Sequence, residues 1–150
     1  MVKIRVGNLL NAKEDVICHQ VNCQGVMGSG VAKAIREKWP EVYESYRACV
    51  DINDHELLGN VLIVPINCGF QSVANMFAQN LYGYDGNRYT SYDAFYKCLE
   101  EIRDGVTRHC SIAFPYNIGS DRGGASWKVI YAMICDVLGD RDVTIYKLED

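Results

Sequence analysis

The sequence lacks the marks of several broad protein classes. Its net charge is -4, so it has no excess of the basic residues that a surface for duplex nucleic acid needs. It contains no apolar run long enough to span a membrane. Residues 1–6 alternate between apolar and charged side chains, as a half-exposed edge strand does, and form no apolar signal-peptide core. We therefore expect a cytoplasmic protein whose partners include neither a membrane nor duplex nucleic acid.

The seven cysteines form no C-x-x-C pair, so the sequence predicts no zinc site, and we expect no metal. Their odd number, and the position of several inside apolar runs, suits small buried side chains in a reducing compartment. Repeats, low-complexity segments and linkers are also missing from the 150 residues. We expect one domain, residues 1–150, that is long enough to bury a full core without disulfides or metals.

Residues 16–35 organise the chain. An apolar run turns polar at His19, Gln20 and Asn22. A loop with three glycines follows, and a helical pattern starts near Ser29. A strand, a glycine loop and a helix in this order direct backbone N–H groups and the positive end of the helix dipole at an anion. The spacing matches neither the G-x-G-x-x-G fingerprint nor a Walker A loop. We interpret the stretch as a phosphate-binding site; the alternative is that the glycines only shape a tight turn.

The rest of the chain alternates between strand and helix patterns. Strands are expected at residues 2–6, 16–21, 60–66, 72–78, 111–115 and 143–148, and helices at residues 29–38, 41–50, 91–103 and 127–138. The β-branched run at residues 60–66 predicts a buried strand, and residues 51–59, with His55, read as a polar connection. A second glycine loop, residues 117–126, again lies between a strand and a helix. Six strands interleaved with helices predict a three-layer α/β domain.

Four pieces of the chain together resemble the macrodomain family, which binds ADP-ribose. They are GNLL at residues 7–10, HQVNCQGVMGSGVA at residues 19–32, NMFAQ with the tyrosine-rich loop at residues 75–95, and the second glycine loop with its flanks at residues 114–127. The resemblance covers essentially the whole chain. Within the family it is similar to the branch of terminal ADP-ribose glycohydrolases, DNA ADP-ribosyl glycohydrolases and yeast-type ADP-ribose-1''-phosphate phosphatases. It implies a three-layer α/β/α macrodomain-like fold with a six-stranded mixed sheet, and no cofactor.

The resemblance also implies ligand-binding roles by position. Asn8 would bind the adenine amino group where the family usually has an Asp, and Asn22 would face the distal ribose. Tyr146 would flank the adenine, with an ordinary strand tyrosine as the alternative. The two glycine loops would hold the diphosphate from two sides through backbone N–H groups. The full set of expected ligand-binding residues is Asn8, Leu9, Val21, Asn22, Gly28, Ser29, Gly30, Val31, Gln79, Ile118, Gly119, Ser120, Arg122, Gly123, Gly124 and Tyr146.

The family's catalytic residues transfer less directly. The terminal glycohydrolases use a Lys before the long loop and an Asp in the second glycine loop, and Gln79 and Gly123 stand at these positions here. Gln79 cannot form a lysine-type adduct, and Asp121 lies two residues before the Asp position. His19 matches a His implicated in the yeast-type phosphatases. His19 and Asp121 are therefore the catalytic candidates; the alternatives are a buried structural histidine and a solvated Asp121–Arg122 turn pair.

The resemblance implies a function as well as a fold. We expect the chain to bind ADP-ribose and to hydrolyse a bond at C1'' of the distal ribose, as an ADP-ribosyl glycohydrolase or an ADP-ribose-1''-phosphate phosphatase. Its partners would be ADP-ribose or an ADP-ribosylated protein, nucleic acid or metabolite. A non-catalytic reader of ADP-ribose is the alternative, and a weaker one is a site for another nucleotide metabolite.

Overall fold

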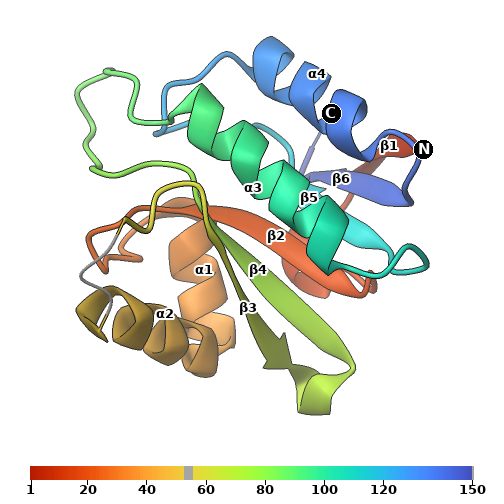
Figure 1. Cartoon of the computed structure of the whole chain (residues 1–150), viewed down its shortest axis with the longest axis horizontal. Helices are drawn as coiled ribbons and strands as arrows, with labels where there is room; N and C mark the ends of the chain where they lie inside the picture. Colours follow the sequence, from red (N-terminus) through yellow and green to blue (C-terminus); the bar gives the residue numbers. More distant parts are fainter. Residues whose placement is uncertain (53–55, 150) are drawn as a thin grey trace.

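A six-stranded sheet lies between two pairs of helices in the computed structural model, which describes residues 1–52 and 56–149 (Figure 1). The strands are β1 (Val2–Val6), β2 (Val16–Val21), β3 (Val61–Ile66), β4 (Gln71–Phe77), β5 (Ile112–Pro115) and β6 (Val143–Lys147). The helices are α1 (Gly30–Lys38), α2 (Pro40–Ile52), α3 (Tyr92–Gly105) and α4 (Trp127–Leu138), with short 3-10 turns η1 (Leu9–Asn11) and η2 (Asn67–Gly69). The predicted three-layer fold with a mixed sheet is confirmed.

The order of the strands places three loops side by side at the carboxyl ends of the parallel strands. The order is β1-β6-β5-β2-β4-β3, and all neighbours are parallel except the antiparallel pair β3 and β4. The carboxyl ends of β5, β2 and β4 therefore lie side by side. Both glycine loops and the tyrosine-rich loop start from these three ends. In open α/β sheets, ligands bind outside the carboxyl ends of the strands.

The two faces of the sheet bury separate apolar cores. Along β2, Ile17 and Val21 face α1 and α2, whereas Cys18 faces α3 and α4, because side chains alternate across a strand. Each helix covers its face with an apolar stripe at helical spacing, such as Ile35 on α1, which Trp39 at the C-cap continues. Strands β2 and β4 are central in the sheet and largely buried on both faces, and this burial includes the polar side chains of His19 and Asn75.

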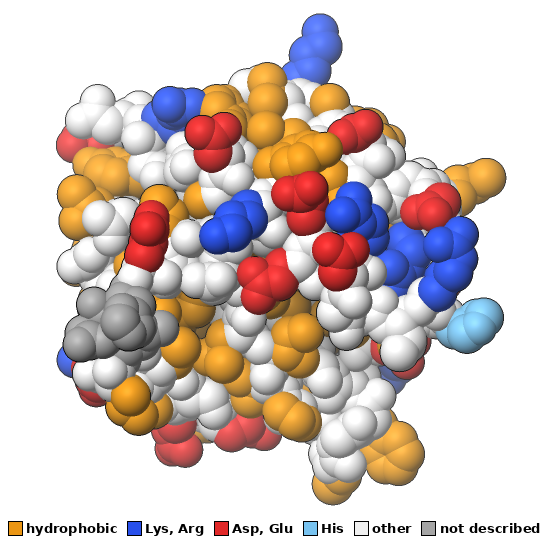
Figure 2. Space-filling model, viewed as in Figure 1, with side chains coloured by type: hydrophobic (Ala, Val, Ile, Leu, Met, Phe, Trp, Pro, Cys, Tyr) orange, Lys and Arg blue, Asp and Glu red, His pale blue; other side chains and the backbone are white. Residues whose placement is uncertain are grey.

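Strand β3 departs from the prediction of a buried strand. It forms the edge of the sheet, and Ile63 keeps 42% of its surface exposed. Apolar side chains gather over β3 and β4 on the face seen in Figure 2, below a zone around α3 where acidic and basic side chains are interspersed. Pro65, which has no N–H to donate, is tolerated because it lies on an edge strand. A β-branched run alone does not distinguish an edge strand from a central one.

The structure also bears on the predicted helix ends, the cysteines and the absence of a membrane span. Ser91 caps α3 as predicted, since its Oγ accepts a hydrogen bond from the Ala94 N–H at 3.2 Å. Helix α2 continues to Ile52, into the predicted polar connection, and His55 lies outside the described residues. All seven cysteines are free, but only Cys18 and Cys98 are fully buried. No helix among the described residues has the length and apolar character needed to cross a membrane.

Candidate functional site

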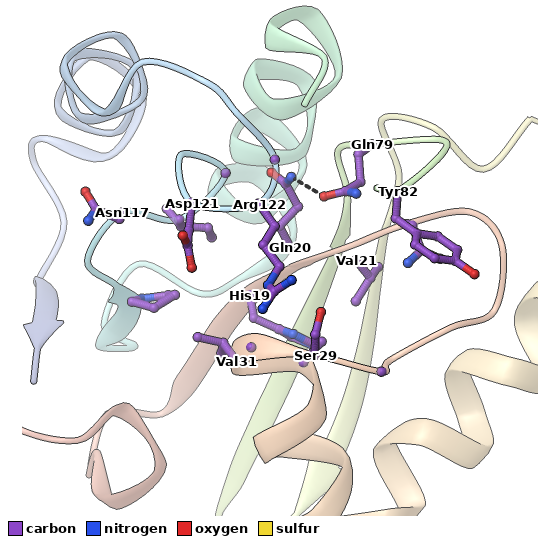
Figure 3. Close-up of a pocket in the computed structure, with 18 of the residues that line it drawn as sticks. His19, Gln20, Val21, Ser29, Val31, Gln79, Tyr82, Asn117, Asp121 and Arg122 are labelled. Atoms are coloured by element: carbon purple, nitrogen blue, oxygen red, sulfur yellow. Dashed lines mark hydrogen bonds between the residues drawn. The ribbon is translucent and has the colours of Figure 1, made fainter. Parts of the chain in front are cut away.

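A cavity of about 340 Å³ opens where the three loops meet. Figure 3 shows His19 and Gln20 on β2, Ser29 and Val31 at the start of α1, and Asp121 and Arg122 in the loop after β5. Of the expected site residues, the cavity is lined by His19, Val21, Asn22, Gly28, Ser29, Gly30, Val31, Gln79, Ile118, Gly119, Asp121, Arg122 and Gly123.

Asn22 and Tyr46 hold the first glycine loop in shape. The Asn22 Oδ1 accepts hydrogen bonds from the Gln24 N–H at 2.9 Å and from the Tyr46 hydroxyl at 2.8 Å, and the Nδ2 donates to the Val26 carbonyl at 2.8 Å. The Tyr46 hydroxyl in turn accepts from the N–H groups of Gly25 and Val26, both at 3.1 Å. Burial raises the pKa of Tyr46 above its usual range, so the hydroxyl stays protonated. The side chain of Asn22 is thus largely engaged in building the loop.

The first glycine loop presents its backbone to the cavity. Gly30 has φ +61°, and a Cβ added there would meet no atom within 4 Å. Residues 28–32 line the cavity, and the side chain of Ser29 makes no capping hydrogen bond at the start of α1. The first N–H groups of a helix have no acceptor inside it. The start of α1 therefore offers the cavity free N–H groups and the positive end of a helix dipole, an arrangement that binds anions.

The second glycine loop needs its glycines for another reason. A Cβ on Gly119 would lie 2.9 Å from the Gln20 Oε1, and one on Gly124 would lie 2.7 Å from the Asn87 carbonyl oxygen. A Cβ on Gly123 would collide with the Thr90 hydroxyl. The missing Cβ atoms leave room for the side chains of Gln20 and Thr90 and for the backbone of Asn87, which pack against the loop.

His19 is enclosed at the floor of the cavity. It is 1% exposed, and its Nε2 lies 2.5 Å from the Asn75 Oδ1. Because the Asn75 Nδ2 donates to the Leu62 carbonyl, its Oδ1 must accept, and the His19 Nε2 carries the proton. Burial lowers the pKa of His19 to about 4, against the opposite effect of the bond to Asn75. The imidazole is therefore neutral at pH 7, and its Nδ1 has no partner among the described residues.

Asp121 and Arg122 lie at the mouth of the cavity. Asp121 supplies the one carboxylate among the described lining residues, and its side chain is exposed (Figure 3). The Arg122 guanidinium stacks over the Tyr84 ring, 4.3 Å from its centroid. The Tyr84 hydroxyl donates to the Ser29 Oγ at 3.3 Å. These contacts join all three loops across the opening.

Five of the expected site residues do not line the cavity. Asn8 is exposed and caps η1 through a 3.0 Å hydrogen bond from the Leu10 N–H. The Tyr146 hydroxyl donates to the Glu14 Oε1 at 2.7 Å. The other three are Leu9, which is buried in the core, Ser120 and Gly124. The adenine-binding roles of Asn8 and Tyr146 stay predictions.

Ten lining residues were absent from the expected set: Gln20, Val26, Ala32, Tyr82, Gly83, Tyr84, Pro115, Tyr116, Asn117 and Leu148. Gln20 could have been found, because it stands next to His19 at a polar strand end. The tyrosines of a long loop give no such signal, since their direction depends on how the loop folds back. Among the described residues, no group of three or more His, Cys, Asp or Glu side chains is placed to hold a metal ion.

Segments of this sequence are similar to parts of known proteins, and its fold is similar to that of solved structures. The chain is 38% identical over 65 residues to the ADP-ribose 1''-phosphate phosphatase of Scheffersomyces stipitis, covering 40% of this chain and 38% of that protein. It is 38% identical over 50 residues to the DNA ADP-ribosyl glycohydrolase of Mycobacterium tuberculosis, covering 33% of this chain and 14% of that protein. These matches span less than half the length of either relative.

The comparison of structures extends over nearly the whole chain. The macrodomain of Mycobacterium tuberculosis DarG has a TM-score of 0.84 and covers 97% of both chains at 21% identity, which shows a common fold. The family model described as Macro domain matches residues 18–134, which include most of β2, both glycine loops and the cavity residues between them. This chain therefore belongs to the Macro domain family.

Proposed function

We propose that the chain binds ADP-ribose in this cavity, with the diphosphate at the start of α1. The observation that carries the proposal is the open backbone of residues 28–30 beneath the first turn of α1. The second glycine loop faces it across the cavity, so a diphosphate would lie between two backbone segments. The names of the two curated relatives, a phosphatase of ADP-ribose 1''-phosphate and an ADP-ribosyl glycohydrolase, support ADP-ribose as the ligand.

We further propose that the chain hydrolyses a bond at C1'' of the distal ribose by direct attack of water. The water oxygen bonds to C1'', the bond from C1'' to its substituent breaks, and the substituent leaves with a proton. Asp121 is the proposed acceptor of the water proton, because its carboxylate lies at the cavity and is open to solvent. His19 is assigned a positioning role, since it is neutral and enclosed.

Gln79 takes the place of a lysine nucleophile and is unsuited to that role. Its Oε1 accepts a hydrogen bond from the Gln20 Nε2 at 2.7 Å, and its Nε2 donates to the Leu81 carbonyl at 2.8 Å. The nitrogen lone pair of an amide is delocalised into the carbonyl, so Gln79 cannot attack C1'' as a lysine amine would. Borohydride added during turnover is therefore expected to trap no adduct, and a trapped lysine would contradict direct attack by water.

Release assays test the proposed hydrolysis. The substrates are ADP-ribose-1''-phosphate, O-acetyl-ADP-ribose, ADP-ribosylated protein and ADP-ribosylated DNA. Asp121→Asn should lower turnover on the active substrate at least tenfold while ADP-ribose affinity stays within about tenfold, or roughly 1.4 kcal/mol. Asp93→Asn, at an exposed carboxylate on α3 away from the cavity, is the matched control. Equal activity of Asp121→Asn and the wild type would refute the role of Asp121.

The alternative function is a reader that binds ADP-ribose without turnover. The engaged amide of Gln79 favours it, because an amide stands where a lysine nucleophile would be and Asp121 is the one carboxylate among the described residues that line the cavity. Tight binding of ADP-ribose with no release from any of the four conjugates would select the reader over the hydrolase.

A further inference from the structure

The side chain of Gln20 lies beneath the second glycine loop. It leaves β2 toward the cavity, and Figure 3 shows it between His19 and Gln79. Its Nε2 donates two hydrogen bonds, to the Gln79 Oε1 at 2.7 Å and to the Thr90 Oγ1 at 2.8 Å. Both N–H bonds of the amide are therefore used, and the orientation of the side chain is fixed. Its Oε1 is buried without a donor among the described residues, which indicates that the amide is placed for its N–H groups.

Thr90 links the side chain of Gln20 to the second glycine loop through hydrogen bonds. It is 2% exposed, and having accepted from Gln20 its hydroxyl donates to the Gly119 carbonyl at 2.8 Å. The N–H groups of Thr90 and Tyr89 both donate to the Gly123 carbonyl, at 3.0 and 2.8 Å. Two consecutive residues therefore hold the second glycine loop at both ends of its 119–123 segment.

The packing leaves this segment little freedom to shift. Gly119 lies against the Gln20 Oε1, and Gly123 lies against the Thr90 hydroxyl, so closely that neither position has room for a Cβ. Residues 121 and 122, between the two tied glycines, carry the charged side chains of this wall of the cavity. The shape of the wall thus depends on a pair of side chains behind it.

We propose that Gln20 and Thr90 are positioning residues for the ligand: they set the 119–123 segment at the distance from the start of α1 that a bound diphosphate requires. The inference rests on the proposed function. The Thr90 hydroxyl acts through the Gly119 carbonyl, and Gln20 acts through the Thr90 hydroxyl.

Titration of ADP-ribose into four variants tests the proposal. Thr90→Val keeps the shape of the side chain but removes the hydroxyl, and we expect an affinity loss of about tenfold. Thr90→Ser restores the hydroxyl and should bind within about threefold of the wild type. Gln20→Met removes both donated hydrogen bonds and should lose about fivefold. Thr107→Val is the matched control: Thr107 is exposed after α3, the one side-chain hydrogen bond of its hydroxyl among the described residues is with the Cys110 Sγ, and it does not line the cavity.

A measurement without ligand separates this inference from the proposed function. Amide hydrogen exchange at residues 119–125 should be faster in Thr90→Val than in Thr90→Ser or the wild type, when it is measured well below the melting temperature of every variant. If wild type binds no ADP-ribose, the proposed function fails, and the exchange rates still decide whether Thr90 holds the loop. If Thr90→Val and Gln20→Met both bind like the wild type, or if their loop exchange is unchanged, the positioning role is refuted.

Discussion

The enclosed imidazole of His19 should make the stability of this protein depend on pH in a specific window. Its pKa is about 4 in the folded protein and 6.5 in the reference state, so folding favours the neutral ring. At a pH between these two values, the unfolded chain therefore binds a proton at His19 and the folded chain does not. The contribution of His19 to stability is complete above pH 6.5 and is lost as the pH falls toward 4.

The size of the loss follows from the two pKa values. The difference between these pKa values corresponds to about 3 kcal/mol in full, of which about 1 kcal/mol is lost by pH 5.5 and most by pH 4.5. His19→Gln isolates this effect, because glutamine carries an N–H at a reach similar to Nε2 and can keep the hydrogen bond to Asn75. Urea unfolding of both proteins at pH 7.5, 6.5, 5.5 and 4.5 measures it.

As the pH is lowered from 7.5, the free energy of unfolding should decrease more for the wild type than for His19→Gln. The extra decrease should match the amounts given above. Other titrating groups are common to both proteins and cancel in the difference. His109→Gln, which removes an exposed imidazole, is the control and should keep the wild-type profile. Parallel profiles for the wild type and His19→Gln would show that the ring is not enclosed as described.

Three further substitutions test other buried polar groups. Arg141 is 4% exposed and donates to three carbonyl groups at the end of α3, so Arg141→Met should lower the free energy of unfolding by about 3 kcal/mol in urea; a change below 1 kcal/mol would contradict this. Tyr46→Phe removes the acceptor of two N–H groups in the first glycine loop and should cost about 2 kcal/mol and weaken ADP-ribose binding, measured by thermal unfolding and titration. Full-affinity binding would show that the loop does not need Tyr46. The Thr144 hydroxyl is buried without a partner among the described residues, so Thr144→Val should stabilise the fold by about 1 kcal/mol, and a destabilised variant would indicate a missed partner.

Local patterns in the sequence predict much of this fold. The apolar stripes of α1 and α3, the apolar run that begins β2 and the capping Ser91 depend on neighbours within a few residues. The edge position of β3 depends instead on which strands pair, and a β-branched run fits a central strand equally well. The three-layer class was therefore predictable, whereas the place of each strand in the sheet was not.

The candidate site divides in the same way. Glycines between a strand and a helix predict the phosphate loop, because that geometry is local. The engagement of Asn22 depends on Tyr46 in α2, and the need for glycine at 119 and 123 depends on Gln20 and Thr90. These contacts join distant segments, so no local pattern reveals them.

Binding of ADP-ribose is the central claim, and calorimetry with a charged substitution in the first glycine loop tests it most directly. Gly28 is exposed, and a Cβ there would meet only a methyl group of Val26 at 3.5 Å, so Gly28→Glu fits the backbone while placing a carboxylate in the anion site. Gly105→Glu, at an open position on α3, is the control. We expect the wild type and Gly105→Glu to bind ADP-ribose in preference to AMP and NAD. We expect Gly28→Glu not to bind it. No heat from the wild type with millimolar ADP-ribose, or equal binding by Gly28→Glu, would contradict it.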